Sequence, residues 1–435
     1  MAQLIEPRVL KGFRDFLPEH ESERQRIMAL LSEAFSGFGF VPIDTPILEY
    51  TEILLGKGGG DTDKQIYRFE DQGGRDVAMR YDLTVPFARY MAAHLHELYL
   101  PFKRFHMAKA FRGENTQRGR YREFVQCDFD IVGTDVASAD FEIVLMIDRA
   151  FRIMGVDGVQ IHIAHRGVFN ALLASLGITS GTDEVLRTVD KLSKIGKEQV
   201  SGQLENLVGG QATSRILELV TASGTNAEIV QLMRDLVPSA GEHADRLEAI
   251  LNAAGTLDIG DRIVIDPSIT RGLDYYTGIV FETFLTRLPE IGSVCSGGRY
   301  DDLAGLYTKE RLPGVGASIG LDRLMAGLEE LGLSATGARG ADAMVFCFDE
   351  ALMGHYHAIA EKLRAAGLRV EVYPEAKKLG QQFAFAEKKG IPAAVLCGQS
   401  EYATGAVNVR DLATRESTDG ISVDDAIEVV RAIRG

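Results

Sequence analysis

Residues 111–130 read FRGENTQRGRYREFVQCDFD and mix arginines and carboxylates with apolar residues of the kind found in protein cores. A second stretch of this kind, RGLDYYTGIVFE, lies at 271–282. A buried charge is costly unless it is paired. We therefore interpret the two stretches as two walls of one anion-binding site.

The first stretch is also a basic exception in an acidic protein. The 435 residues include 47 Lys and Arg against 62 Asp and Glu, a net charge of −15. Between residues 101 and 126, however, seven Lys and Arg stand against two Glu. The overall charge opposes diffuse binding to nucleic acid, so an RNA partner would have to be held by local basic patches.

The composition excludes several protein classes. The length predicts two or three domains. No run of eighteen apolar residues exists and the N-terminus has no apolar signal-peptide core, which predicts a cytoplasmic protein that does not span a membrane. The histidines join no carboxylate or cysteine cluster at ligand spacing, so we expect no metal site. We expect neither a disulfide framework nor a thiolate metal site from the four scattered cysteines, Cys127, Cys295, Cys347 and Cys397.

The N-terminal third predicts a helix followed by an antiparallel sheet. Residues 21–37 carry apolar side chains at helical spacing, and residues 41–50 read as an extended segment broken by prolines. Aromatic and β-branched residues separated by turns favour antiparallel strands. Three such segments lie between 74 and 135: RDVAMRYDLTVPF, YLPFKRFHMAKAFR and YREFVQCDFDIVG.

The rest of the chain predicts a discontinuous sheet domain and a separate C-terminal module. Helical periodicity from about 167 to 255 indicates a helical insertion, and strand patterns then return until 323. A glycine-rich linker precedes alternating strands and helices, which indicate a compact α/β module. We predict a sheet domain formed by two separate segments, 1–170 and 255–332. An insertion at 171–254 lies between them in sequence, and the α/β module occupies 341–435.

Arg112 and Glu114 are candidate nucleotide ligands. We place Arg112 in the strand AKAFRGEN, with Glu114 two residues later on the same face. For either residue alone, a surface salt bridge is the stronger interpretation. With the basic loop at 115–122, a nucleotide fits better, because a guanidinium binds phosphate bidentately and a carboxylate accepts from an adenine amino group.

Other candidates have structural alternatives. Arg271 directly precedes two tyrosines, which suggests that it neutralises a charge in a transition state, although each tyrosine alone is typical of half-buried packing. Arg323, in the first turn of a predicted helix, could lie flat over a purine or simply face solvent. The glycines of PGVGASIGLDRL at 313–324 lack the G-x-G-x-x-G spacing, which excludes a Rossmann loop.

Taken together, these residues resemble the class II aminoacyl-tRNA synthetases, and among them the histidyl-tRNA synthetase family. KGFRDFLP at 11–18 and the helix and strand at 21–50 resemble the N-terminal part of the family, including motif 1. Residues 104–130 resemble motif 2, and GVGASIGLDRL resembles motif 3. RGLDYY followed by SGGRYD is specific to the histidyl branch. The resemblance implies an α+β fold, with an antiparallel sheet flanked by helices, a helical insertion and a C-terminal α/β anticodon-binding domain.

The resemblance also implies roles for individual residues. Arg112 would hold the α-phosphate of ATP, Glu114 would meet the adenine amino group and Arg323 would stack over the adenine. Arg271 looks like the catalytic arginine of the family, on the α-phosphate opposite Arg112. Asp82 and Thr84 would bind the α-amino group of histidine. The residues that would surround its side chain are Gln126, Asp130, Tyr275 and Tyr276.

The implied activity is ATP-dependent ligation of L-histidine to tRNA(His) through a histidyl-adenylate, with Mg²⁺ accompanying ATP and with a homodimeric assembly. In this scheme the insertion is an RNA clamp. Two alternatives remain. One is a non-catalytic regulatory subunit of ATP phosphoribosyltransferase, and the other is an adenylate-forming ligase that acts on a small molecule. Neither would need the C-terminal module at 341–435.

Overall fold

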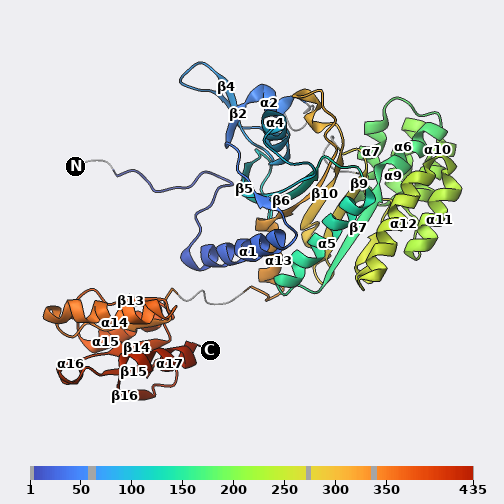
Figure 1. Ribbon diagram of the computed structural model, residues 1–435. Helices are drawn as coiled ribbons and strands as arrows, with labels where there is room; N and C mark the ends of the chain where they lie inside the picture. Colours follow the sequence, from blue (N-terminus) through green and yellow to red (C-terminus); the bar gives the residue numbers. More distant parts are fainter. Residues whose placement is uncertain (1–3, 57–64, 271–275, 335–339, 435) are drawn as a thin grey trace. The chain divides into compact units, whose positions relative to one another are not determined.

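A computed structural model describes residues 4–56, 65–270, 276–334 and 340–434 (Figure 1). The chain forms two compact units. One contains Met1–Asp15 and Arg24–Ser334, and the other contains Phe16–Glu23 and Ala335–Gly435. The residues that resemble synthetase motifs 2 and 3 lie in the first unit.

The first unit is built on an eight-stranded sheet with the order β1-β5-β6-β11-β10-β9-β7-β8. Every pairing from β5 to β7 is antiparallel, and only the two edge pairings are parallel. The predicted antiparallel sheet is therefore confirmed. Its strands, in sheet order, are Val41–Pro42, Phe102–Phe111, Glu123–Val132, Gly314–Gly320, Cys295–Tyr300, Ile279–Leu285, Val159–His165 and Ile263–Ile265.

The two faces of this sheet differ in chemistry because side chains alternate along each strand. One face is apolar, and Phe105, Cys127 and Phe129 of this face belong to the main core. Its apolar side chains belong to the same core as those of α1 (Pro18–Gly37), α5 (Ala137–Ile153) and α13 (Leu321–Glu330). The other face carries the polar residues of β5 and β6 that alternate with these: Arg104, His106, Gln126, Asp128 and Asp130.

A small subdomain flanks this polar face and corrects part of the strand prediction. Of the segment RDVAMRYDLTVPF only Asp76–Met79 (β4) is a strand, and helix α4 begins at Thr84. The Asp82 carboxylate accepts a hydrogen bond from the Val85 amide (3.1 Å), which satisfies a free donor at the helix start. Pro86 lies in the first turn, where a missing amide proton costs little. The subdomain contains β2 (Leu48–Tyr50), β3 (Arg68–Glu70), α2 (Thr51–Leu55) and α4 (Thr84–His94).

The segment between β7 and β8 is helical, as its periodicity predicts, and contains no strand (Figure 1). Apolar residues of these helices belong to the same core as the apolar face of the sheet. The insertion is therefore packed onto the sheet rather than tethered to it. Its helices are α6 (Arg166–Ser175), α7 (Thr182–Val189), α8 (Leu192–Ile195), α9 (Lys197–Val208), α10 (Gly210–Val220), α11 (Asn226–Leu236) and α12 (Gly241–Thr256).

The second unit is an α/β module with its own core. Its sheet has the order β13-β12-β14-β15-β16, with β13, β12 and β14 parallel and the last two strands antiparallel. The predicted alternation is confirmed, but β16 has an exposed polar sequence that gave no strand signal. The elements are β12 (Ala343–Val345), α14 (Met353–Ala365), β13 (Val370–Val372), α15 (Leu379–Lys388), β14 (Ala393–Leu396), α16 (Gln399–Thr404), β15 (Val407–Asp411), β16 (Ser417–Ile421) and α17 (Val423–Arg434).

The four cysteines are buried free thiols. None of the described helices combines the length and the apolar character needed to cross a bilayer. Within the described ranges, no three His, Cys, Asp or Glu side chains are grouped so that they could hold a metal ion.

Candidate active site

A cavity of about 900 Å³ opens on the polar face of the eight-stranded sheet. Strands β6, β10 and β11, the loop after β5 and the start of α13 contribute to its walls. The cavity brings together predicted site residues that are far apart in sequence. Those that line it are Thr84, Arg112, Glu114, Gln126, Asp130, Tyr276 and Arg323.

Glycines keep the floor of this cavity open. Gly316 of β11 pairs with Asp130 of β6, and a Cβ at Gly316 would lie 2.0 Å from the Asp130 Oδ1. A Cβ at Gly298 of β10 would lie 3.0 Å from the ring of Tyr276. Side chains at these positions would displace the two groups, so the glycines are needed for close packing of Asp130 and Tyr276.

Asp130 is held in a buried ion pair. The Tyr300 hydroxyl donates to its Oδ1 (2.5 Å), and Nη2 of Arg104, which is fully buried, lies 2.7 Å from its Oδ2. Burial raises the pKa of Asp130, while Arg104 and Tyr300 act to lower it. Both carboxylate oxygens therefore already face protein groups, which fixes the position of this side chain.

Asp128 also lines the cavity and was missed by the sequence reasoning. The alternation in QCDFD places it on the same face as Gln126 and Asp130, a signal that was present in the sequence. Its Oδ2 lies 3.5 Å from the Thr84 hydroxyl, which donates to it. Burial, above all other causes, raises the pKa of Asp128 to about 7.

Gln126 and Tyr276 complete the polar floor. Gln126 donates from Nε2 to the Ser318 hydroxyl (3.0 Å). Burial raises the pKa of the Tyr276 phenol, and the nearby carboxylates of Asp130 and Asp128 add to this effect. The phenol therefore stays protonated at neutral pH and can donate a hydrogen bond.

Arg112 and Glu114 line the cavity but do not share a strand face, which corrects the prediction. Strand β5 ends at Phe111, and the amide of Arg112 donates to the Arg122 carbonyl (2.9 Å) beyond the strand end. The Arg112 side chain donates from Nε to the Tyr81 carbonyl (2.9 Å). Glu114 lies in the following loop, with Oε2 3.8 Å from the Arg120 guanidinium. Loop geometry, rather than strand alternation, brings both residues to the cavity.

Arg323 is the third residue of α13, as predicted for the first turn. Its Nη1 donates to the Ser293 carbonyl (2.6 Å). The turn of the loop after β5 packs against it at Gly119, whose φ of +69° favours glycine and where a Cβ would lie 3.0 Å from the Arg323 Cα. The loop and α13 therefore form one continuous wall.

Arg14 of the N-terminal segment supports this wall, a role that was not predicted. The Arg14 guanidinium lies over the Tyr121 ring, 3.1 Å from its centroid, and forms an ion pair with Asp322 of α13. Asp322 also accepts from the Val125 amide (2.8 Å). Arg14 thus connects the loop after β5 with α13.

Asp82, a predicted residue of the site, does not line the cavity. Asp82 is fully buried at the start of α4. Its negative charge acts to raise the pKa of Asp128. Arg271 and Tyr275 lie outside the described residues.

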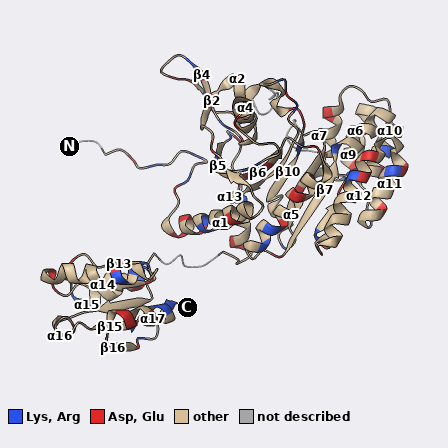
Figure 2. Cartoon of the chain, viewed as in Figure 1, with Lys and Arg blue, Asp and Glu red and all other residues tan. Residues whose placement is uncertain are grey.

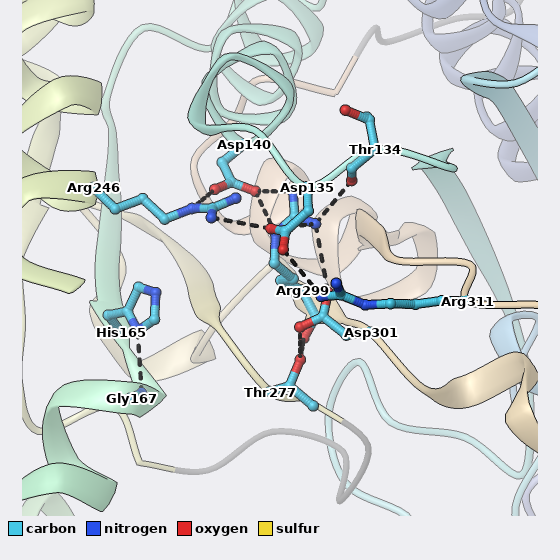
Figure 3. A network of polar contacts seen from close by, with 10 residues as sticks. All are labelled: Thr134, Asp135, Asp140, His165, Gly167, Arg246, Thr277, Arg299, Asp301 and Arg311. Atoms are coloured by element: carbon cyan, nitrogen blue, oxygen red, sulfur yellow. Dashed lines mark hydrogen bonds and ion pairs between the residues drawn. The ribbon is translucent and has the colours of Figure 1, made fainter. Parts of the chain in front are cut away.

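A buried polar network holds strand β10, which contributes to the cavity wall (Figure 3). Arg299 of β10 donates to Asp140 Oδ1 of α5 from Nε (3.0 Å) and Nη2 (2.6 Å). Arg246 of α12 donates to the other oxygen of Asp140 (2.5 Å). The Thr277 amide donates to the Arg299 carbonyl (2.8 Å). The insertion, α5 and β10 are therefore joined beside the site.

Two protein-family models match this chain and together span most of its length. The family model described as histidyl-tRNA synthetase matches residues 12–324, and the one described as anticodon binding domain matches residues 342–433. This chain belongs to the histidyl-tRNA synthetase family. The predicted resemblance is confirmed, and the first match spans every residue of the candidate site.

Individual relatives agree with this assignment. The histidine–tRNA ligase of Treponema denticola is 51% identical over 90% of this chain and 89% of its own length. That of Rhodopirellula baltica is 48% identical over 99% of both chains. The crystal structure of histidyl-tRNA synthetase from Nostoc sp. PCC 7120 is 32% identical, with a TM-score of 0.89 over 99% of this chain and 100% of that one.

Proposed function

We propose that this protein ligates L-histidine to tRNA(His) in two steps, through a histidyl-adenylate formed from ATP. The observation that carries the proposal is the convergence in one cavity of residues from positions 84 to 323, to which the resemblance assigns the binding of ATP and histidine. The names of the relatives, histidine–tRNA ligase, support the same activity.

The histidine pocket is proposed on the polar floor. Thr84 and Asp82, at the start of α4, would bind the α-ammonium group. Gln126, Asp130, Tyr275 and Tyr276 would surround the imidazole. The buried Asp130 carboxylate and the protonated Tyr276 hydroxyl supply an acceptor and a donor, which together can satisfy both imidazole nitrogens. A pocket that depends on hydrogen bonds to a polar side chain needs no editing site.

The ATP site is proposed along the wall formed by the loop after β5 and α13. Glu114 would accept from the adenine amino group, and Arg323 would stack on the adenine. Arg112 and Arg271 would hold the α-phosphate from opposite sides. ATP would enter as its magnesium complex, in which the metal neutralises the pyrophosphate that leaves.

The first step joins the histidine carboxylate to the α-phosphorus. A carboxylate oxygen forms the new bond to phosphorus while the bond to the bridging oxygen breaks and pyrophosphate leaves. In the second step, a terminal ribose hydroxyl of tRNA attacks the histidyl carbonyl and AMP leaves. Negative charge builds on the α-phosphoryl group in the first step, so guanidinium groups already aimed there lower the barrier.

The tRNA is proposed to contact two further parts. We assign residues 171–254 as an RNA clamp and 341–435 as the anticodon-binding domain, with 1–170 and 255–332 as the catalytic domain. The insertion is acidic overall, with seven Lys and Arg against eleven Asp and Glu, and Figure 2 shows both signs interspersed on its helices. Lys194 of α8 nevertheless lines the cavity, which supports a contact with the tRNA end that enters it.

In the second unit, the exposed lysines at 377, 378, 388 and 389 are candidates for an RNA-facing edge. Homodimerisation and a cytoplasmic location complete the proposal. The regulatory-subunit alternative is not favoured, because such subunits lack an anticodon-binding module and this chain matches one at 342–433.

The experiment is ATP–pyrophosphate exchange with each of the amino acids in turn, followed by charging of total tRNA. We expect exchange with histidine alone and charging of tRNA(His). Exchange without charging would support the small-molecule ligase. No histidine-dependent exchange would contradict the proposal.

A further inference from the structure

Asp128 occupies the middle of the cavity floor, and the proposed function gives it no role. It lies between Gln126 and Asp130 on β6, opposite His106 of β5 and Ser318 of β11. Directly opposed residues in a sheet share a face, so all of these side chains lie on the cavity side. The Asp128 side chain is only 2% exposed, although it lines the cavity.

Asp128 and Asp130 differ in their partners. The Tyr300 hydroxyl donates to Asp130 Oδ1, and Asp130 Oδ2, which accepts no well-formed hydrogen bond in the described chain, is paired with the Arg104 guanidinium. Asp128 receives the long contact from Thr84 on Oδ2 and a side-chain hydrogen bond from Ser318 that acts to lower its pKa, whereas its buried Oδ1 has no well-formed hydrogen bond within the described part of the chain. A buried carboxylate oxygen without a donor is unfavourable. Its presence in a substrate cavity indicates that a ligand supplies the missing donor.

We infer that Asp128 binds the α-ammonium group of the substrate histidine, beside Thr84. This inference rests on the proposed function and names a further residue of that site. A carboxylate complements a cationic donor, and the Thr84 contact places Asp128 at the end of the pocket that is proposed to hold the ammonium group. Asp130, fixed by Tyr300 and Arg104, is left for the imidazole end.

The charged surroundings of Asp128 are consistent with this role. Burial, followed by the carboxylates of Asp130 and Asp82, raises the pKa of Asp128 to about 7, while Arg104 and Ser318 oppose the shift. Near pH 7 the free protein is thus a mixture of both protonation states, and a bound ammonium group favours the ionised one. Other titratable groups that interact with this cluster are Arg80, His106, Tyr276, Cys127 and Cys295.

The test compares two ligands on two proteins by isothermal titration calorimetry. The ligands are histidine and 3-(imidazol-4-yl)propanoate, which lacks only the ammonium group. Asp128→Asn is expected to weaken histidine binding about 10- to 100-fold, the size of one charged hydrogen bond, and to weaken the analogue less than about 2-fold. An equal loss for both ligands, or no loss for histidine, would overturn the inference.

Asp148→Asn is the matched control, because Asp148 is a buried aspartate of α5 that does not line the cavity and is paired with Arg152 and Arg262. Histidine affinity should stay within about 2-fold of the parent, since no buried contact to the ligand is removed. A similar loss in this control would mean that any buried aspartate has the same effect, and would overturn the specific role of Asp128.

A second measurement needs no variant. Wild-type protein at pH 6.5, titrated in buffers of different ionisation enthalpy, should release more protons on binding histidine than on binding the analogue, once the protons lost from the imidazole of each ligand are subtracted. Equal release would overturn the inference even if Asp128→Asn does not fold. Failure of the proposed function looks different, because the wild-type protein would then neither bind histidine nor support histidine-dependent pyrophosphate exchange.

Discussion

The two faces of the eight-stranded sheet are formed by the same strands but have different roles. The covered face buries Phe105, Cys127 and Phe129 against α1, α5 and α13. The open face carries Gln126, Asp128 and Asp130 and borders a cavity of about 900 Å³. Neighbouring residues of one strand therefore act separately, one set for stability and the other for binding. Substitutions on the two faces should affect different measurements.

The largest expected effect is on the covered face. Phe35 of α1 is fully buried and its ring lies 4.8 Å from that of Phe129. Phe35→Ala should lower the free energy of unfolding by about 3–5 kcal/mol, because it leaves a cavity in the core. Urea unfolding measures this loss. Pyrophosphate exchange per folded molecule should stay within about 3-fold of the parent. A loss of exchange without a loss of stability would contradict the separate roles of the two faces.

For the arginines proposed to hold the α-phosphate, we expect the opposite result, a loss of activity with little change in stability. Arg112→Ala should lower the rate of adenylate formation about 10²-fold or more, since it removes a preorganised charge, while changing the stability little. The same loss is expected for Arg271→Ala. Arg311→Ala is the control, because Arg311 is an exposed arginine outside the cavity. Exchange rates near the parent value for Arg112→Ala would contradict its role.

Asp128, on the open face, should make the stability of the protein depend on pH. The pKa of this carboxyl is raised in the folded state from 3.8 to about 7, so the folded protein holds the proton more tightly than the unfolded chain does. Its contribution to stability is therefore present below pH 4 and is lost as pH rises towards 7. Asp128→Asn should raise the free energy of unfolding at pH 8 by on the order of 1–2 kcal/mol, with no gain at pH 4.

Urea unfolding of parent and variant at the two pH values measures this effect. Asp148→Asn breaks buried ion pairs and should instead lower the stability. A variant at position 128 that is less stable than the parent at pH 8 would show that this carboxylate stabilises the free protein.

The smallest expected effect concerns the insertion. Lys194→Ala should lower tRNA charging about 3- to 10-fold and leave pyrophosphate exchange unchanged, as expected for one phosphate contact. Lys197→Ala is the matched control, because this nearby lysine does not line the cavity. Deleting the whole insertion is a poorer test, since its helices share the core of the sheet. Equal losses in charging and exchange would argue against a contact limited to tRNA.

The parts of the fold that could be predicted are those whose residues form a pattern within a single stretch of the sequence. Antiparallel strands, the helical insertion and the C-terminal α/β alternation all show in the spacing of apolar residues. Helix α4 did not, because its start depends on the Asp82 carboxylate accepting from Val85. Strand β16 did not, because backbone pairing stabilises it and its side chains are exposed.

The site was predictable in part. Arg112, Glu114 and Arg323 line the cavity as expected, although Arg112 and Glu114 reach it through a loop rather than a strand. Asp128 could have been found from the alternation of QCDFD. The network of Arg246, Asp140 and Arg299 could not, because Asp140 is more than a hundred residues from either arginine in the sequence and only the tertiary fold brings them together.

The central claim is that the stretches at 111–130 and 271–282 meet on one phosphoryl group over the open face of the sheet. The most direct test is a crystal structure of the full chain with a non-hydrolysable histidyl-adenylate analogue that keeps the phosphate. We predict the analogue on the open face, with the guanidinium groups of Arg112 and Arg271 both within hydrogen-bond distance of its phosphate. An analogue bound elsewhere, or an Arg271 side chain directed into a separate cleft, would contradict this account.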